Sequence, residues 1–182
     1  MGLIPPSAAG CTASLRAAVW TVGPCTQRVV WARIDRLMPS PGSHVGAAAI
    51  ITNDRGGILL VHHTYGPRNW ELPGGGREAG EPAAGTVVRE VREETELTVI
   101  RSDLAGVYYE PANDWHHFTF LCTVAEGRDP RPDRIEISEC AFWSLSNLPR
   151  PITDFTLRRI TDASSGQPRP AFHVIGPRRL LE

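Results

Sequence analysis

Two apolar stretches near residue 50 predict a pair of strands joined by a tight turn. Residues 45–52 read VGAAAIIT, and such a near-continuous apolar run is typical of a strand that is covered on both faces. The sequence NDRGG follows at residues 53–57, and apolar residues return over residues 58–63. Asn, Asp and Gly tolerate the backbone angles of hairpin turns, so we expect a strand, a turn and a second strand.

A different pattern, over residues 82–96, predicts an amphipathic helix. It follows three consecutive glycines at residues 74–76, which indicate a tight loop because glycine tolerates backbone angles closed to other residues. Pro82 suits the first helical position, where its missing N–H costs nothing. At about 100° per residue, one arc of this helix is apolar and the adjoining arc is acidic. The apolar arc holds Ala84, Val87, Val88 and Val91, and the acidic arc holds Glu90, Glu93 and Glu94.

The rest of the chain predicts three further strands and a second helix. Strands are expected over residues 98–109, with a bulge near 103–106, over residues 116–124 and over residues 141–143. Residues 153–163 have helical spacing, with large apolar side chains on one face.

The composition narrows the class of protein. Of 182 residues, 41% are hydrophobic and 21% are charged, and the net charge is −1. This length suits one domain with a sizeable core plus extensions. The near-neutral net charge gives no sign of the excess positive charge that binding to duplex nucleic acid or an anionic membrane usually requires. No apolar run reaches the ~18 residues that a membrane-spanning helix needs.

The four cysteines argue against a zinc site or a disulfide scaffold. Cys11, Cys25, Cys122 and Cys140 lie far apart, without CxxC spacing. Cys122 and Cys140 fall within apolar runs, so we expect buried, reduced thiols there. Reduced thiols fit a cytoplasmic protein.

The acidic arc of the first helix is chemically unusual. Glu90, Glu93 and Glu94 are neighbours, and like charges at such spacing repel by about 0.2–0.5 kcal/mol per pair. A simply solvated helix face is one explanation. Three carboxylates beside a buried face also suit a hard divalent cation, since Mg²⁺ takes oxygen ligands and is often shared with substrate phosphates.

The spacing of these residues resembles the signature of the Nudix hydrolases. Gly75 is followed after five residues by Glu81, and after seven more by the run REVREE at residues 89–94. The resemblance extends over roughly residues 44–150 and includes the phrase WELPGGG at residues 70–76. One position departs from the family pattern, because Glu96 stands where the family has glycine.

Similarity to this family implies both a fold and an activity. The implied fold is an α/β/α sandwich around a mixed β-sheet. The implied activity is a metal-dependent hydrolase (a pyrophosphatase) that cuts the pyrophosphate bond of a nucleoside diphosphate linked to another group. ADP-ribose and nucleoside triphosphates are the main substrate options, and dinucleoside polyphosphates or a capped RNA end stay open.

The resemblance also assigns roles to individual residues. Glu90, Glu93 and Glu94 match the metal-binding glutamates, with Mg²⁺ as the expected cofactor and Mn²⁺ as a substitute. Glu93 and Glu94 are also expected to act in catalysis, with Arg89 orienting the glutamates and Glu81 assisting from the loop.

Further candidates lie outside the helix. Arg68, Tyr65 and Gly75 are candidates for substrate binding, and Glu136 and Glu139 are candidates for an outlying general base.

The resemblance implies a domain organisation as well. Residues 43–165 would form the Nudix hydrolase domain, between an N-terminal extension and a C-terminal tail. The extension, residues 1–42, is expected to be partly disordered, with a short helix at residues 29–38. The tail comprises residues 166–182.

An alternative from another class is a Nudix-fold module that binds or senses a nucleotide without cutting it. Such domains lose one or more of the motif glutamates, whereas this chain retains them all. The expected partner is a small-molecule nucleotide, with no duplex nucleic acid and no membrane, and a homodimer is left open.

Replacing Glu93 tests the metal-binding hypothesis. Glu93→Gln should abolish most Mg²⁺-dependent turnover while leaving the fold intact, because the amide removes an anionic metal ligand from an exposed helix face. Steady-state hydrolysis assays and circular dichroism check the two halves of this expectation. Full activity in the variant would remove Glu93 from the site.

Overall fold

The computed structural model describes residues 44–166 and 170–182. The N-terminal extension, the helix expected at residues 29–38, and Cys11 and Cys25 lie outside the described residues. Within the described ranges, no helix is long and apolar enough to cross a membrane.

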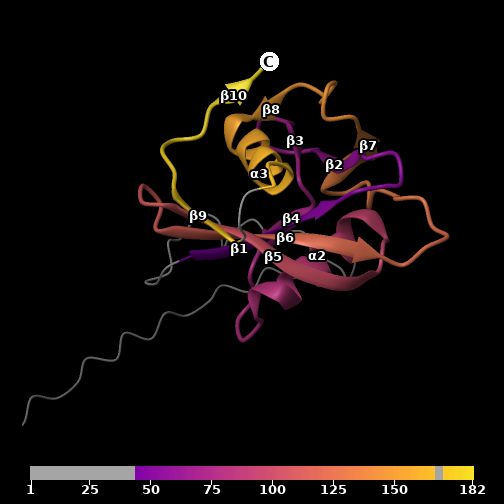
Figure 1. Cartoon of the computed structure of the whole chain (residues 1–182), viewed down its shortest axis with the longest axis horizontal. Helices are drawn as coiled ribbons and strands as arrows, with labels where there is room; N and C mark the ends of the chain where they lie inside the picture. Colours follow the sequence, from indigo (N-terminus) through magenta and orange to yellow (C-terminus); the bar gives the residue numbers. More distant parts are fainter. Residues whose placement is uncertain (1–43, 167–169) are drawn as a thin grey trace, which may run out of the picture. The chain divides into compact units, whose positions relative to one another are not determined.

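Two five-stranded sheets form the domain (Figure 1). The first sheet has the order β4-β1-β6-β5-β9, with β4 at Gly74–Gly76, β1 at His44–Ile51, β6 at Trp115–Val124, β5 at Val99–Glu110 and β9 at Ala171–Val174. The second has the order β10-β8-β3-β2-β7, with β10 at Leu180–Leu181, β8 at Ile152–Thr153, β3 at Trp70–Glu71, β2 at Ile58–His63 and β7 at Ile137–Trp143. Both sheets are mixed, since β1 pairs parallel with β6 but antiparallel with β4, and β3 pairs parallel with β8 but antiparallel with β2.

Strand β1 lies between two hydrophobic clusters, as its uninterrupted apolar run predicted. Its residues Ala47, Ala49 and Ile51 pack with the apolar face of helix α2, which spans Ala83–Thr95. The alternate residues Ala48 and Ile50 pack in a second cluster with side chains of β3, β8 and helix α3, which spans Asp154–Ser164. Figure 1 shows the two helices on opposite faces of the first sheet. The expected α/β/α layering is confirmed, with two mixed sheets in place of one.

The turn after β1 forms as expected, but the two strands that it joins belong to different sheets. The side-chain oxygen of Asn53 accepts hydrogen bonds from the N–H groups of Arg55 and Gly57, at 3.1 and 2.8 Å. A single bridge joins Thr52 to Ile58, and β2 then continues in the other sheet. No longer hairpin ladder forms between β1 and β2, and β2 pairs instead with β3 and β7.

Strands β5 and β6 and helix α3 match the predicted ranges to within one residue, whereas β7 begins at Ile137 instead of residue 141, and β8 was not predicted. The register of β5 against β6 shifts between Leu104 and Gly106, where a bulge was expected. Helix α3 begins after Thr153, whose hydroxyl accepts the N–H of Thr156 at 3.1 Å. The segment after residue 170, expected only as a tail, adds β9 to the first sheet and β10 to the second.

Helix α2 begins and ends with backbone features visible in its sequence. Pro82 was expected at the first helical position. It is instead the N-cap, one position earlier, and has extended backbone angles. Glu96 has φ 59° and ψ 6°, and its N–H donates to the carbonyl of Arg92 at 3.0 Å. The helix therefore does not run on past the missing glycine, and Glu96 itself adopts the left-handed conformation.

Restoring glycine at this position should stabilise the protein. The left-handed conformation costs an L-residue roughly 1–2 kcal/mol, and glycine avoids this cost. Because glycine also has more conformational freedom in the unfolded state, Glu96→Gly should raise the free energy of unfolding by only about 0.5–1 kcal/mol. Urea unfolding followed by circular dichroism measures the change. Glu96→Ala is the matched control, because it removes the charge but retains the side-chain carbon. Equal stabilisation by both variants would assign the effect to charge instead of backbone strain.

Candidate active site

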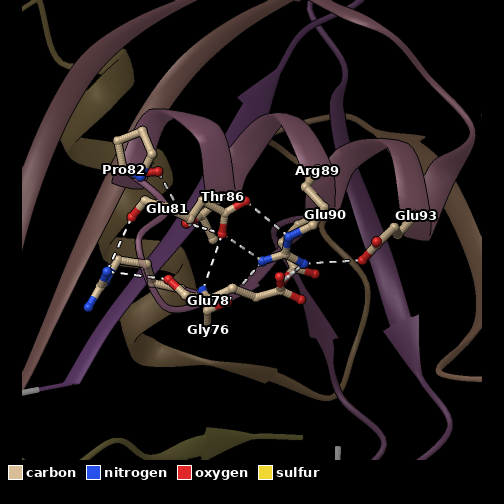
Figure 2. Close-up of polar contacts among 9 residues, drawn as sticks. Gly76, Glu78, Glu81, Pro82, Thr86, Arg89, Glu90 and Glu93 are labelled. Atoms are coloured by element: carbon tan, nitrogen blue, oxygen red, sulfur yellow. Dashed lines mark hydrogen bonds and ion pairs between the residues drawn. The ribbon is translucent and has the colours of Figure 1, made fainter. Parts of the chain in front are cut away.

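Arg89, on α2, binds three glutamates at once (Figure 2). Its Nε and Nη2 donate to the two carboxylate oxygens of Glu81 at 3.1 and 3.0 Å. Its Nη1 donates to Glu90 at 2.9 Å and to Glu93 at 3.1 Å. Nη2 also donates to the carbonyl of Gly76 at 3.1 Å, so the guanidinium ties the glycine strand β4 to the helix.

Glu81 is held in the loop before α2 by donors from three directions. The hydroxyl of Thr86 donates to its carboxylate at 2.9 Å, and the N–H of Glu78 donates at 3.2 Å, beside the Arg89 contacts (Figure 2). The hydrogen bonds from Arg89 are the main reason that the pKa of Glu81 falls to about 2. Glu81 therefore stays ionised at every ordinary pH and serves as the fixed counter-charge of Arg89.

Glu90 lies against the backbone of β4. A side-chain carbon at Gly75 would come within 2.3 Å of a carboxylate oxygen of Glu90, so the carboxylate occupies the space that a side chain at residue 75 would take. Burial raises the pKa of Glu90, and the Arg89 guanidinium offsets part of that effect. Gly75, a predicted substrate-binding residue, thus has a clear structural role in seating Glu90.

Glu94 is the most deeply buried of the motif carboxylates. It is 5% exposed, and one of its oxygens accepts the N–H of Gly74 at 2.8 Å. Burial is the largest cause of a pKa raised well above its usual value, and the charge of Glu90 adds to it. A side-chain carbon at Gly74 would lie 2.2 Å from the carbonyl oxygen of Ala47, so this close approach also requires glycine.

These carboxylates fit a divalent cation by charge and by chemistry. Burial and the negative charges of neighbouring carboxylates disfavour ionised Glu90 and Glu94, and a nearby cation would offset both effects. Carboxylate oxygens are the ligands that Mg²⁺ prefers. However, within residues 44–166 and 170–182, no three acidic, histidine or cysteine side chains converge closely enough to hold an ion by themselves. Glu93 in particular points toward Arg89, with its side chain 60% exposed.

Of the two candidates for an outlying base, the structure brings Glu136 toward the motif glutamates. The negative charge of Glu136 raises the pKa of both Glu90 and Glu94. Glu139 instead lies on β7 opposite His62 of β2, and it raises the pKa of the Cys140 thiol. The catalytic role of either residue stays a prediction.

Asp133 was missed by the sequence analysis. Its charge also raises the pKa of Glu94, and its carboxylate binds the backbone just before β7. The available signal was an aspartate a few residues before a strand, where its side chain commonly caps a turn.

Arg68 and Tyr65 lie together in the loop between β2 and β3. Tyr65 stacks on His63 with ring centroids 4.9 Å apart, and its carbonyl accepts the N–H of Arg68 at 3.1 Å. Arg68 has a left-handed backbone, with φ 49°, and is exposed. Their part in substrate binding stays a prediction.

Comparisons with known proteins agree with this fold. A model of the NUDIX domain matches residues 42–163. A Bacillus subtilis (strain 168) protein named "Putative 8-oxo-dGTP diphosphatase" is 32% identical over 121 residues, which cover 66% of this chain and 80% of that protein. An ADP-ribose pyrophosphatase of Methanocaldococcus jannaschii is 35% identical over 99 residues, which cover 51% of this chain and 57% of that protein. The crystal structure of a MutT NUDIX hydrolase from Burkholderia pseudomallei has 29% identity and a TM-score of 0.59, covering 66% of this chain and 98% of that chain.

The chain belongs to the Nudix family, because the NUDIX domain accounts for most of its length. It is a Nudix-type pyrophosphohydrolase, which is an acid anhydride hydrolase, and Nudix hydrolases generally use divalent metal ions. The match spans just over half the length of the archaeal relative.

Replacing Glu94 by its amide should stabilise the metal-free protein. Because burial raises the pKa of this carboxyl, folding disfavours its ionised form, and Glu94→Gln should add on the order of 1 kcal/mol at pH 7. The glutamine oxygen can still accept the Gly74 N–H. The advantage should shrink as the pH falls, because protonation neutralises the wild-type carboxyl as well. Urea unfolding in EDTA at several pH values measures this, and a variant less stable than wild type at pH 7 would contradict it.

Proposed function

We propose that this chain is a metal-dependent hydrolase of the pyrophosphate bond in a nucleoside diphosphate linked to another group. The observation that carries the proposal is the arrangement around Arg89, which fixes Glu81, Glu90 and Glu93 beside the buried carboxylate of Glu94. Anionic groups concentrated in this way bind a diphosphate only if a cation lies between them. Mg²⁺ is the proposed ion, with Mn²⁺ as a substitute.

The residues take distinct roles in the proposed mechanism. Glu90, Glu93 and Glu94 would hold the cation, and a bound cation would supply charge neutralisation of the diphosphate and a lowered pKa of water. Arg89 holds Glu90 and Glu93 in orientation, and Glu81 fixes Arg89 through its two hydrogen bonds.

Hydrolysis also requires a proton acceptor. The oxygen of water bonds to one phosphorus, the bond from that phosphorus to the bridging oxygen breaks, and the bridging oxygen leaves with the other phosphate. We propose that the carboxylate of Glu136 accepts the proton lost by water, in the role of general base. The segment that leads to Glu136 is hydrogen-bonded to the last turn of α2, where the N–H of Arg131 donates to the carbonyl of Thr95 at 2.9 Å, and this contact supports a position near the proposed metal-binding glutamates.

ADP-ribose and nucleoside triphosphates are the proposed substrate classes. The Methanocaldococcus jannaschii relative is named an ADP-ribose pyrophosphatase, and the Bacillus subtilis relative is named for an oxidised nucleoside triphosphate. We propose the cytoplasm as the compartment, which the free thiols of Cys122 and Cys140 support. The proposed domain organisation is a Nudix domain at residues 43–165 between two extensions.

A substrate panel tests the proposed function. ADP-ribose, other nucleoside diphosphate derivatives and nucleoside triphosphates are incubated with the full chain and Mg²⁺ or Mn²⁺, and phosphate-ended products are measured. At least one substrate should be cleaved with metal and not with EDTA. Arg89→Gln should lower kcat by about 10-fold or more, because it releases two metal-binding glutamates.

The control variant is Arg92→Gln, which changes an exposed arginine of the same helix. It should leave kcat within about twofold of wild type, as expected for a surface position away from the site. Nucleotide binding without any metal-dependent product would favour the non-catalytic binding module instead.

A further inference from the structure

The loop that precedes β7 is tied to two elements that border the site. At one end, the N–H of Arg131 donates to the carbonyl of Thr95, in the last turn of α2, at 2.9 Å. At the other end, the N–H of Thr64, just after β2, donates to the carbonyl of Glu136 at 2.8 Å. The loop therefore runs from the C-terminal end of the metal-binding helix to the end of β2, with Glu136 at its second attachment.

The side chain of Asp133 binds the same loop from within. One of its carboxylate oxygens accepts the backbone N–H groups of Ile135, Glu136 and Ile137, at 3.0, 3.1 and 2.9 Å. Three donors converging on one charged oxygen hold three consecutive peptides in a single arrangement. The adjoining Arg134 has a left-handed backbone, with φ 64°, which turns the chain around the carboxylate.

Thr64 completes the attachment on the opposite side of the peptide chain. Its hydroxyl donates to the carbonyl of Ile135 at 2.7 Å and lies 3.1 Å from the carbonyl of Glu136. Glu136 is thus held through its N–H by Asp133 and through its carbonyl by Thr64.

We propose that Asp133 and Thr64 are positioning residues, which fix the backbone of Glu136 so that its carboxylate faces the metal-binding glutamates. This inference rests on the proposed function, in which Glu136 is the general base. Glu136 itself is exposed, so side-chain packing does not hold it. Misplacing a reacting group by about 1 Å can lower the rate about 100-fold, which makes such backbone anchoring relevant to catalysis.

The two functions of Asp133, hydrogen-bond acceptor and negative charge, can be separated by substitution. Asp133→Ala removes both and should lower kcat about 10- to 100-fold, with KM changed by less than about twofold. Asp133→Asn retains the accepting oxygen without the charge and should recover kcat to within about threefold of wild type. An asparagine variant as impaired as the alanine variant would overturn the inference.

A double-mutant cycle asks whether Asp133 acts through Glu136. Glu136→Gln should lower kcat by itself, as removal of a general base does by about 10²–10⁴-fold. Adding Asp133→Ala to Glu136→Gln should then lower kcat little further, because the side chain at position 136 no longer accepts a proton wherever it is positioned. Fully additive losses would show that Asp133 supports activity by another route, and would overturn the inference.

Thr64 provides a second and milder test. Thr64→Val keeps the backbone hydrogen bond to Glu136 but removes the hydroxyl, so kcat should fall about 3- to 10-fold, as loss of a single hydrogen bond allows. Thr64→Ser should restore it. If Asp133→Ala does not fold, this pair decides the question, and an unchanged kcat in Thr64→Val would overturn the inference.

A matched control variant and the wild-type protein distinguish a failure of this inference from a failure of the proposed function. Asp129→Ala, at an exposed aspartate of the same chain segment, should leave kcat unchanged. An active wild type whose Glu136→Gln variant keeps full kcat would overturn this inference and leave the hydrolase function standing. A wild type without any metal-dependent hydrolysis would overturn the proposed function itself.

Discussion

Two carboxylates buried side by side are the constraint on which the site depends. Glu90 and Glu94 lie one helical turn apart on α2, and both are withdrawn from water against β4. Burial raises the pKa of each and the charge of Glu90 raises that of Glu94 further, so the folded chain works against their ionised form. A protein without a use for such an arrangement would gain stability by replacing either residue. Stability given up at one location is a common mark of a functional site.

The glycines of β4 make the arrangement sterically feasible. Gly74 offers its N–H to Glu94, and Gly75 leaves the space that the Glu90 carboxylate fills. Arg89 then holds Glu90 and Glu93 from the solvent side and is itself held by Glu81. One guanidinium cannot neutralise three glutamates together with Glu94, and the remaining negative charge is what suits the site to a divalent ion.

Much of this fold could be predicted because its strongest signals are local. The uninterrupted apolar run of β1 predicted a strand covered on both faces, and the 3.6-residue period predicted α2 to within one residue at its start. Sheet membership could not be predicted in the same way. The turn at Asn53 looks like an ordinary hairpin, but β1 and β2 enter different sheets because of partners far away in sequence. The short strands β9 and β10 likewise depend on neighbours that carry no local signal.

Part of the site could likewise be predicted from local sequence, and part of it could not. Arg89, Glu81 and the helix glutamates share one sequence motif, so their proximity could be anticipated from helical geometry. Thr64 lies far in sequence from Asp133 and reaches the same backbone segment only through the pairing of β2 with β7. Backbone anchoring of this type uses ordinary residue types at unremarkable spacing. Three-dimensional contacts are therefore needed to recognise it.

The contact between Gly74 and β1 links the carboxylate of Glu94 to the far side of the sheet. The space where a Gly74 side chain would stand is filled by the carbonyl oxygen of Ala47, and the next residue, Ala48, faces the cluster beneath α3. A change in packing under α3 would shift this strand, and the Gly74 N–H that seats Glu94 would shift with it. Substitutions distant from α2 can therefore displace the Glu94 carboxylate without contacting it.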